Sequence, residues 1–327
     1  MAAASALQAA LDGRRALVLT IDPALRLRTA LSMDASGLQQ KVPLELPQPA
    51  GELWAALLNV RQSLDRAVLR EAKPEEAKAI LEHPLYQVLA TSLAGMQELM
   101  AIERIHQALA ENFEAIFIDT APSRHALEFL DKPEFFAHLL SFPIVKLVGR
   151  TYNWWIRTQL WKLNRVAVQL YSRFEEILGE SLVHQVLEFF SIFRKVAQNY
   201  ADRAEQTLKL LHDPAITSFT IVTTPFKARR DGEYFWKELT NRKFSIRGMV
   251  VNRLWPGFPV ELPPNSSPQI HELVRWYGDV SESHQKIWKE ISGDFSGRIP
   301  RLIALQELPR DVDGVPALRQ IATKLKW

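Results

Sequence analysis

Two short apolar runs in this sequence each end in an aspartate that is followed by a proline-containing turn. The first run, residues 16–21, leads into Asp22, and the second, residues 115–118, leads into Asp119. Continuous apolar runs of this length are typical of strands that are buried on both faces. Because the carboxyl ends of parallel strands meet at one edge of a sheet, where ligands bind, we expect both aspartates at that edge. The pattern restricts the chain to an α/β fold with a parallel sheet.

The rest of the sequence alternates between strand and helix signals. Further strands are predicted later in the chain, at residues 217–223, 248–251 and 300–305. Apolar residues recurring at helical spacing predict helices at residues 2–11, 53–69 and 85–109. Strands that alternate with helices favour a doubly wound, mostly parallel sheet.

One long segment carries no strand signal. Residues 133–213 are helical in pattern and rich in aromatic side chains, so we interpret them as an α-helical insertion subdomain. Residues 1–132 and 214–327 then form the α/β core. The apolar side chains of the insertion either pack on one another or line an exposed groove for a partner helix. The candidates for such a groove are Trp154, Trp155, Phe189 and Phe193.

Composition excludes some classes of protein. The 327 residues contain no cysteine, which excludes disulfides and thiolate zinc sites. A formal net charge of +3 is too small to indicate nucleic-acid binding. No uncharged apolar run reaches the ~18 residues needed to span a bilayer, and no basic leader precedes an apolar segment. We expect a soluble, cytoplasmic protein with at most peripheral membrane contact.

The strand-end polar residues are the candidates for chemistry. Taken alone, Asp22 and Asp119 each suit a turn or a helix cap, and Asn252 suits a turn after the strand at 248–251. Taken together, two acids at one sheet edge favour phosphoryl transfer, which needs an acid near Mg²⁺ and a group that orients the attacking water. The amide of Asn252 could read the edge of an adenine base.

Three motifs occur in the order seen in one known family. They are DPALRL from Asp22, DTAPSRHALEFL from Asp119 and VVNR from Val250. The chain resembles the anion-transporting ATPases, which comprise arsenical pump-driving ATPases and ATPases that target tail-anchored proteins. The resemblance covers almost the whole chain and is greatest to the bacterial branch. It implies a P-loop NTPase-like nucleotide-binding core that uses ATP and Mg²⁺.

The resemblance also implies residue roles. Asp22 would polarise the attacking water, Asp119 would hold the Mg²⁺ shell through water, and Asn252 with Arg253 would contact the nucleotide base. The remaining switch and positioning residues would be Pro23, Thr120, Pro122, Ser123 and His125. Members act as homodimers or as heterodimers with a paralogue, and in targeting members the helical insertion holds a hydrophobic helical protein client.

The sequence departs from the family at its start. Members open with a strand and the phosphate-binding loop GKGGVGKT, but no G-x-x-x-x-G-K-[ST] loop occurs here, and residues 1–7 resemble the helix that follows it. We therefore expect a chain that lacks the first strand and P-loop, is inactive alone, and binds ATP and Mg²⁺ only where that loop is present. The alternatives are a nucleotide-independent interaction protein and an arsenite pump-driving subunit, which the absence of cysteine disfavours.

Overall fold

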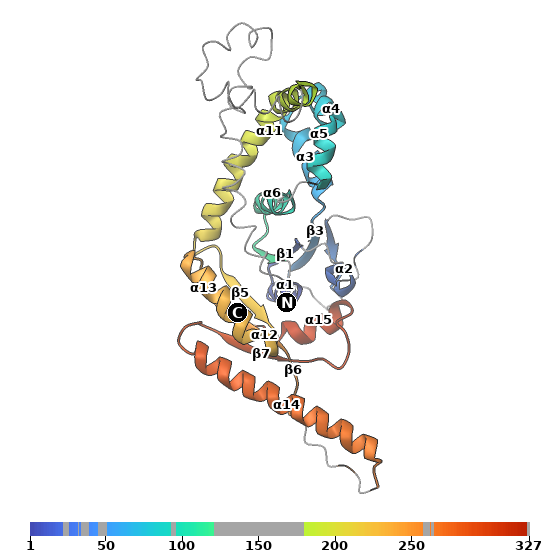
Figure 1. Ribbon diagram of the computed structural model, residues 1–327, viewed down its shortest axis with the longest axis vertical. Helices are drawn as coiled ribbons and strands as arrows, with labels where there is room; N and C mark the ends of the chain where they lie inside the picture. Colours follow the sequence, from blue (N-terminus) through green and yellow to red (C-terminus); the bar gives the residue numbers. More distant parts are fainter. Residues whose placement is uncertain are drawn as a thin grey trace.

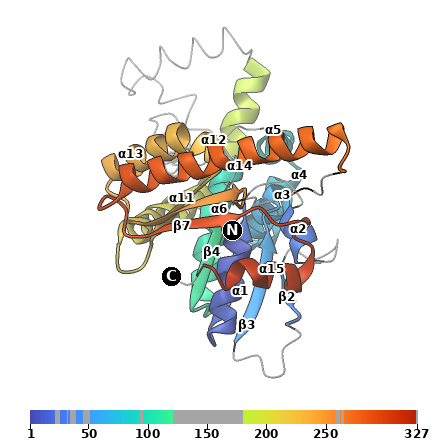
Figure 2. The same ribbon diagram turned by 90° about the horizontal axis from the view of Figure 1, so that it is seen from below.

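The computed structural model describes residues 1–21, 26–31, 33, 39–44, 51–92, 96–120, 180–257, 262 and 265–325. Figure 1 shows an elongated molecule with a group of helices at one end and the long helix α14 (Pro268–Phe295) at the other. The strands lie between them. Seen from below, in Figure 2, α14 runs across the width of the molecule.

The described strands form two sheets. In the four-stranded sheet the order is β2 (Gln39–Val42), β3 (Glu52–Leu57), β1 (Arg15–Thr20) and β4 (Ala115–Asp119). β1 is parallel to β3 and β4, whereas β2 is antiparallel to β3. The three-stranded sheet has the order β5 (Phe219–Thr223), β6 (Ile246–Leu254) and β7 (Leu302–Gln306), all parallel.

Helices connect these strands. The first part of the chain contributes α1 (Ala2–Leu11), α2 (Arg26–Ala30), α3 (Val60–Glu71), α4 (Pro74–Glu82), α5 (Pro84–Ser92) and α6 (Met96–Ala110). The second part contributes α11 (Glu180–His212), α12 (Pro225–Lys227), the π-helical turn η3 (Ala228–Gly232), α13 (Glu233–Asn241), α14 and α15 (Gly314–Ala322). Among these residues no helix is long and apolar enough to cross a membrane.

Both faces of the sheets are covered, as a doubly wound fold requires. Leu17 and Leu19 of β1 belong to an apolar cluster that includes residues of α6, α11 and α14. Ala16 and Val18 point to the opposite face, where they join the alanines of α1 and residues of α15. Each cluster continues into the second sheet, because β6 also alternates between the two faces. The predicted α/β class with a mostly parallel sheet is confirmed, although the strands divide between two sheets.

One predicted helix is wrong in its first part. Residues 53–57 of the expected helix at 53–69 belong to strand β3 (Glu52–Leu57), and the helix α3 covers Val60–Glu71. Leu53 and Ala55 face α1, whereas Trp54 and Ala56 face the other cluster. A short apolar run buried on both faces has no visible period of two, so its spacing also fits a helix. The strand β2 carried no apolar signal and was not predicted.

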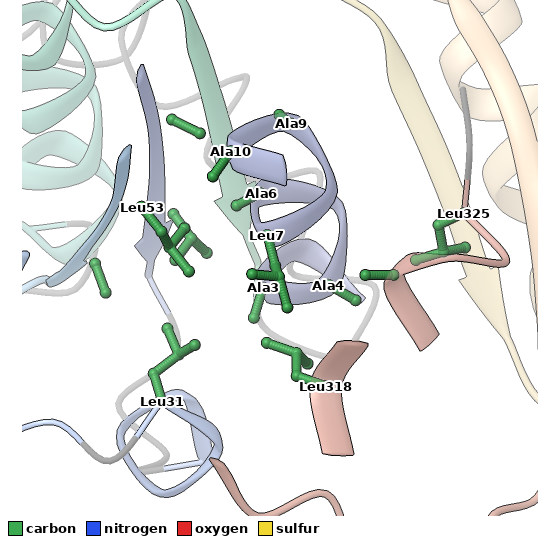
Figure 3. Packing of buried hydrophobic residues seen from close by; sticks show 14 of the residues in the cluster. Ala3, Ala4, Ala6, Leu7, Ala9, Ala10, Leu31, Leu53, Leu318 and Leu325 are labelled. Atoms are coloured by element: carbon green, nitrogen blue, oxygen red, sulfur yellow. The ribbon is translucent and has the colours of Figure 1, made fainter. Parts of the chain in front are cut away.

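Helix α1 packs closely because its inward positions are alanines. Figure 3 shows Ala3, Ala6 and Ala10 along one helix, with Leu53 and Leu318 nearby on other elements. Ala6 and Ala10 have no exposed surface. Small side chains let the helix axis approach the sheet, and this leaves no space for a larger residue.

We expect Ala6→Leu to destabilise the fold by ~1–3 kcal/mol, because extra methylene groups in a filled core force strained side chains. Urea unfolding followed by circular dichroism measures the change. Ala79→Leu is the matched control, since Ala79 lies exposed in helix α4. An unfolding midpoint for Ala6→Leu equal to that of the control would show that α1 has room the structure does not indicate.

The helices at one end of the molecule share a third apolar cluster. Helix α11 packs against α3, α4, α5 and α6 there, and Phe189 is only 1% exposed. The helical layer therefore includes α3, α4, α5 and α6 as well as α11. The predicted insertion begins at residue 133, which lies outside the described residues, so the division into core and insertion stays a prediction.

Candidate functional site at the strand ends

The ends of β1 and β4 lie side by side. Thr20 pairs with Asp119 in the parallel ladder, and the backbone N–H of Ile21 donates a 2.9 Å hydrogen bond to the carbonyl oxygen of Asp119. Ile21, the residue before Asp22 in the sequence, therefore lies beside Asp119 at this sheet edge. Asp22 itself lies outside the described residues, as do Pro23, Pro122, Ser123 and His125. Asp119 and Thr120 are half-buried at this edge.

The start of helix α1 lies at the same place. Burial lowers the pKa of the Met1 α-amino group, and the nearby Asp119 carboxylate partly opposes this shift. The first turn of a helix presents unpaired backbone N–H groups and the positive end of the helix dipole, which together favour anions. The sheet edge therefore places the negative Asp119 carboxylate near the positive end of the α1 helix dipole.

The Asp119 carboxylate is the described candidate for holding Mg²⁺ at this sheet edge. No group of three or more His, Cys, Asp or Glu side chains that could hold a metal occurs in the described part of the chain. Mg²⁺ keeps several waters and is held by one or two carboxylates plus substrate phosphates. A single half-buried carboxylate such as Asp119 fits that kind of binding, whereas it does not fit an all-protein metal cage.

The predicted base-reading residues lie at the end of β6, in the other sheet. Asn252 is half-buried, and Arg253 is exposed with a positive φ of 65°. The Nε of Arg253 lies 3.5 Å from Oε2 of Glu307, just beyond β7. The β6–β7 register shifts between Val251 and Leu254, so the ladder is irregular where these side chains stand.

The proposed groove residues in the described part are packed. The rings of Phe189 and Phe193 stack with centroids 5.1 Å apart, and Phe189 also contacts the His83 ring. Phe189 is buried and Phe193 is half-buried. Trp154 and Trp155 lie outside the described residues, so their part in a groove stays a prediction.

Sequence reasoning missed a buried cluster of charges between α3, α6 and α11. Glu103 is 1% exposed and accepts hydrogen bonds from Arg70 (2.5 Å) and Arg203 (2.8 Å). Arg203 also binds Glu71 at 2.8 Å. Burial raises the pKa of Glu103, but the bonds from Arg70 and Gln107 and the Arg203 charge outweigh it, so the pKa is lowered. The available signal was an acid between Ile102 and Ile105 on the apolar face of α6.

Comparison with known proteins identifies relatives of this chain. The sequence model of the anion-transporting ATPases matches residues 1–326. The "ATPase GET3C" of Arabidopsis thaliana is 24% identical over 332 residues, covering 97% of this chain and 76% of the relative. The "ATPase GET3" of Rhodotorula glutinis is 25% identical over 240 residues, covering 72% of this chain and 60% of the relative.

A third relative covers less. The "ATPase ASNA1 homolog" of Entamoeba dispar is 25% identical over 167 residues, which are 50% of this chain and 44% of that protein. The chain thus spans less than half of one relative and about three quarters of another. The match of the family model, in contrast, runs from the α1 start through both sheets to α15. The chain therefore belongs to the anion-transporting ATPase family.

Proposed function

We propose that this chain provides the acidic and base-binding part of a Mg²⁺-dependent ATPase whose hydrolysis cycle drives a conformational change on a protein client. The observation that carries the proposal is the pairing of Thr20 with Asp119, which brings the chain up to Ile21, the residue before Asp22, to the sheet edge occupied by Asp119 and the start of α1. Family membership supports nucleotide as the substrate. The DPALRL and DTAPSRHAL motifs support a place in the bacterial branch.

Each residue has a distinct role in this proposal. Asp22 polarises the attacking water, and Asp119 hydrogen-bonds to water of the Mg²⁺ shell. When bound, Mg²⁺ neutralises charge that develops on the phosphates. Asn252 and Arg253 hold the nucleotide base. The switch positions that support the two aspartates are Pro23, Thr120, Pro122, Ser123 and His125.

The assembly is also part of the proposal. We infer a cytoplasmic homodimer, or a heterodimer with a paralogue, that takes a hydrophobic helical client at the helical subdomain. The triphosphate needs several hydrogen-bond donors, which in this family come from the GKGGVGKT loop. Because the 327 residues contain no such loop, we expect them to bind ATP weakly by themselves.

Steady-state phosphate release tests the proposal with two forms of the protein. The 327-residue chain should hydrolyse ATP negligibly, whereas a P-loop-bearing form, with a strand and GKGGVGKT placed before Met1, should hydrolyse it with Mg²⁺. In that form Asp22→Asn should keep nucleotide affinity and lose turnover, since water polarisation acts in the transition state. Asp119→Asn should shift the Mg²⁺ titration.

Two results would contradict the assignment. Turnover by the 327-residue chain that disappears in Asp22→Asn would show that the P-loop is not needed. A P-loop-bearing form that binds and hydrolyses no nucleotide would favour the nucleotide-independent interaction protein instead. Asp12→Asn is the control, because Asp12 is the C-cap residue of α1 and lies at the opposite end of that helix from Met1.

A further inference from the structure

Three side chains of helix α14 hold the backbone that follows β6. The N–H of Trp255 donates to Nδ1 of His284 at 3.0 Å, and Nε2 of Gln285 donates to the Trp255 carbonyl oxygen at 2.9 Å. The hydroxyl of Ser281 donates to the carbonyl oxygen of Pro256 at 2.6 Å. The backbone N–H of Trp255 and the carbonyl oxygens of Trp255 and Pro256 are thus all bound by one helix.

These bonds act where the ladder of β6 fails. Arg253 has a positive φ, and the register with β7 shifts between Val251 and Leu254. Ser281 and His284 are 3% and 4% exposed, so their bonds form away from water. Leaving a buried backbone N–H unpaired costs about as much free energy as losing a hydrogen bond. The bonds therefore favour a single conformation of the backbone at Trp255 and Pro256.

Aromatic rings enclose the His284 imidazole. The Trp255 ring lies edge-on to it with centroids 6.0 Å apart, and the Phe226 ring lies edge-on at 4.8 Å. The Trp255 ring also stacks on the Tyr277 ring, with centroids 4.3 Å apart. The contacts fix the imidazole plane and with it the direction of the Nδ1 lone pair.

The hydrogen bond requires a neutral imidazole. Because Nδ1 accepts from Trp255, the ring proton belongs on Nε2, and that atom is buried without a partner among the described residues. Burial lowers the pKa of His284, and Glu307 opposes the shift. Glu307 and its partner Arg253 stand at the ends of β7 and β6, and Gln285 and Ser281 on α14 are uncharged.

We propose that His284, with Ser281 and Gln285, is a positioning residue that holds Asn252 and Arg253 in place for the nucleotide base. This rests on the proposed function, in which these two residues meet the base. His284 does not touch the nucleotide itself. It fixes the turn that begins two residues after Arg253, so that the half-buried Asn252 amide keeps one orientation.

Two measurements test the proposal. Hydrogen exchange at the Trp255 amide in the 327-residue chain reports whether the turn is held. The affinities of the P-loop-bearing form for ADP and GDP report whether the base is read. His284→Leu removes the acceptor at similar size, and His284→Asn keeps an acceptor near the Nδ1 position. His271→Leu is the control, because His271 is exposed on the same helix.

We expect His284→Leu to speed Trp255 exchange about tenfold and to reduce the ADP-over-GDP preference by a similar factor, since one buried hydrogen bond is worth about a factor of ten. His284→Asn should keep most of the Trp255 protection and of the ADP-over-GDP preference. His271→Leu should change neither the exchange rate nor the preference. Gln285→Ala, which removes an exposed donor and leaves the core intact, should give a smaller change in the same direction.

The pH dependence gives a second signature. The folded pKa of His284 is lowered from 6.5, so the bond persists just below pH 6.5 and is released as the pH falls through the folded pKa. Trp255 protection should fall with pH in the wild type and stay level in His284→Asn.

The outcomes separate the two hypotheses. Unchanged Trp255 exchange in His284→Leu would overturn the positioning role, and so would faster exchange with an unchanged ADP-over-GDP preference. The P-loop-bearing form with His284 unchanged could bind neither ADP nor GDP while the Trp255 amide stays protected from exchange. That result would overturn the proposed function, but it would leave the contact between His284 and Trp255 established.

Discussion

Replacing Glu103 by alanine is expected to lower the free energy of unfolding by about 3–5 kcal/mol, the range seen when one partner of a buried ion pair is removed. Arg70 and Arg203 both bind this carboxylate, and its side chain is 1% exposed. Without it, Arg203 keeps its ion pair with Glu71 but loses its pair with the carboxylate of α6. Urea unfolding of wild type and variant measures the difference.

A matched control comes from the same helix as Arg203. Glu205 pairs with Lys209 on the exposed side of α11, and Glu205→Ala should leave the urea midpoint unchanged. Equal midpoints for Glu103→Ala and Glu205→Ala would show that the buried cluster adds nothing to stability.

The same cluster predicts a sensitivity to acid. The folded pKa of Glu103 lies below its ordinary value of 4.5, so its contribution is present above pH 4.5 and is lost as the pH falls through the folded pKa. Wild-type stability should therefore drop more steeply below pH 4.5 than that of Glu103→Gln, which carries no titrating group there. Parallel slopes would contradict the low folded pKa.

Phe189→Ala is expected to lower the free energy of unfolding by about 3–5 kcal/mol, because a buried aromatic ring is replaced by a cavity. Phe189 lies in the helical cluster with Tyr86 and Met100 and stacks on Phe193. Thermal or urea unfolding gives the cost, and capture of a hydrophobic helical peptide by the same variant reports on client binding.

The control for this ring is Phe226, which is 68% exposed beside α14. Phe226→Ala should change the midpoint little. Were Phe189→Ala to keep its stability and lose peptide capture, Phe189 would line a groove rather than a core. A large loss of stability with unchanged capture assigns the ring to packing.

The strands were predictable where their composition was unambiguous. β1, β4 and β5 are apolar runs that end near a polar residue and a proline, and that pattern has few alternatives. The predicted strand at 248–251 is the apolar part of β6, which continues through Asn252 and Arg253 to Leu254. β3 was not recognised, since Leu53 and Leu57 fit a helix equally well. The division of the strands between two sheets depends on which edges pair, and pairing between distant segments leaves no local trace in a sequence.

The candidate site shows the same limit. Local pattern identified Asp119 and Asn252, because each directly follows an apolar run. It did not find His284, which lies 29 residues beyond Trp255 in the chain and meets its N–H only through the fold. Arg203 and Glu103 are 100 residues apart, so their contact was equally hidden.

The two sheets share apolar clusters on both faces, yet no backbone ladder among the described residues joins one sheet to the other. Apolar contact has no preferred direction, whereas a ladder fixes strand against strand. Within each sheet, movement of a strand would break hydrogen bonds. Between the sheets, the described contacts are apolar side chains that pack from both sides. The edge bearing Asp119 and the strand bearing Asn252 are therefore held together by side-chain packing and not by backbone hydrogen bonds between the described strands.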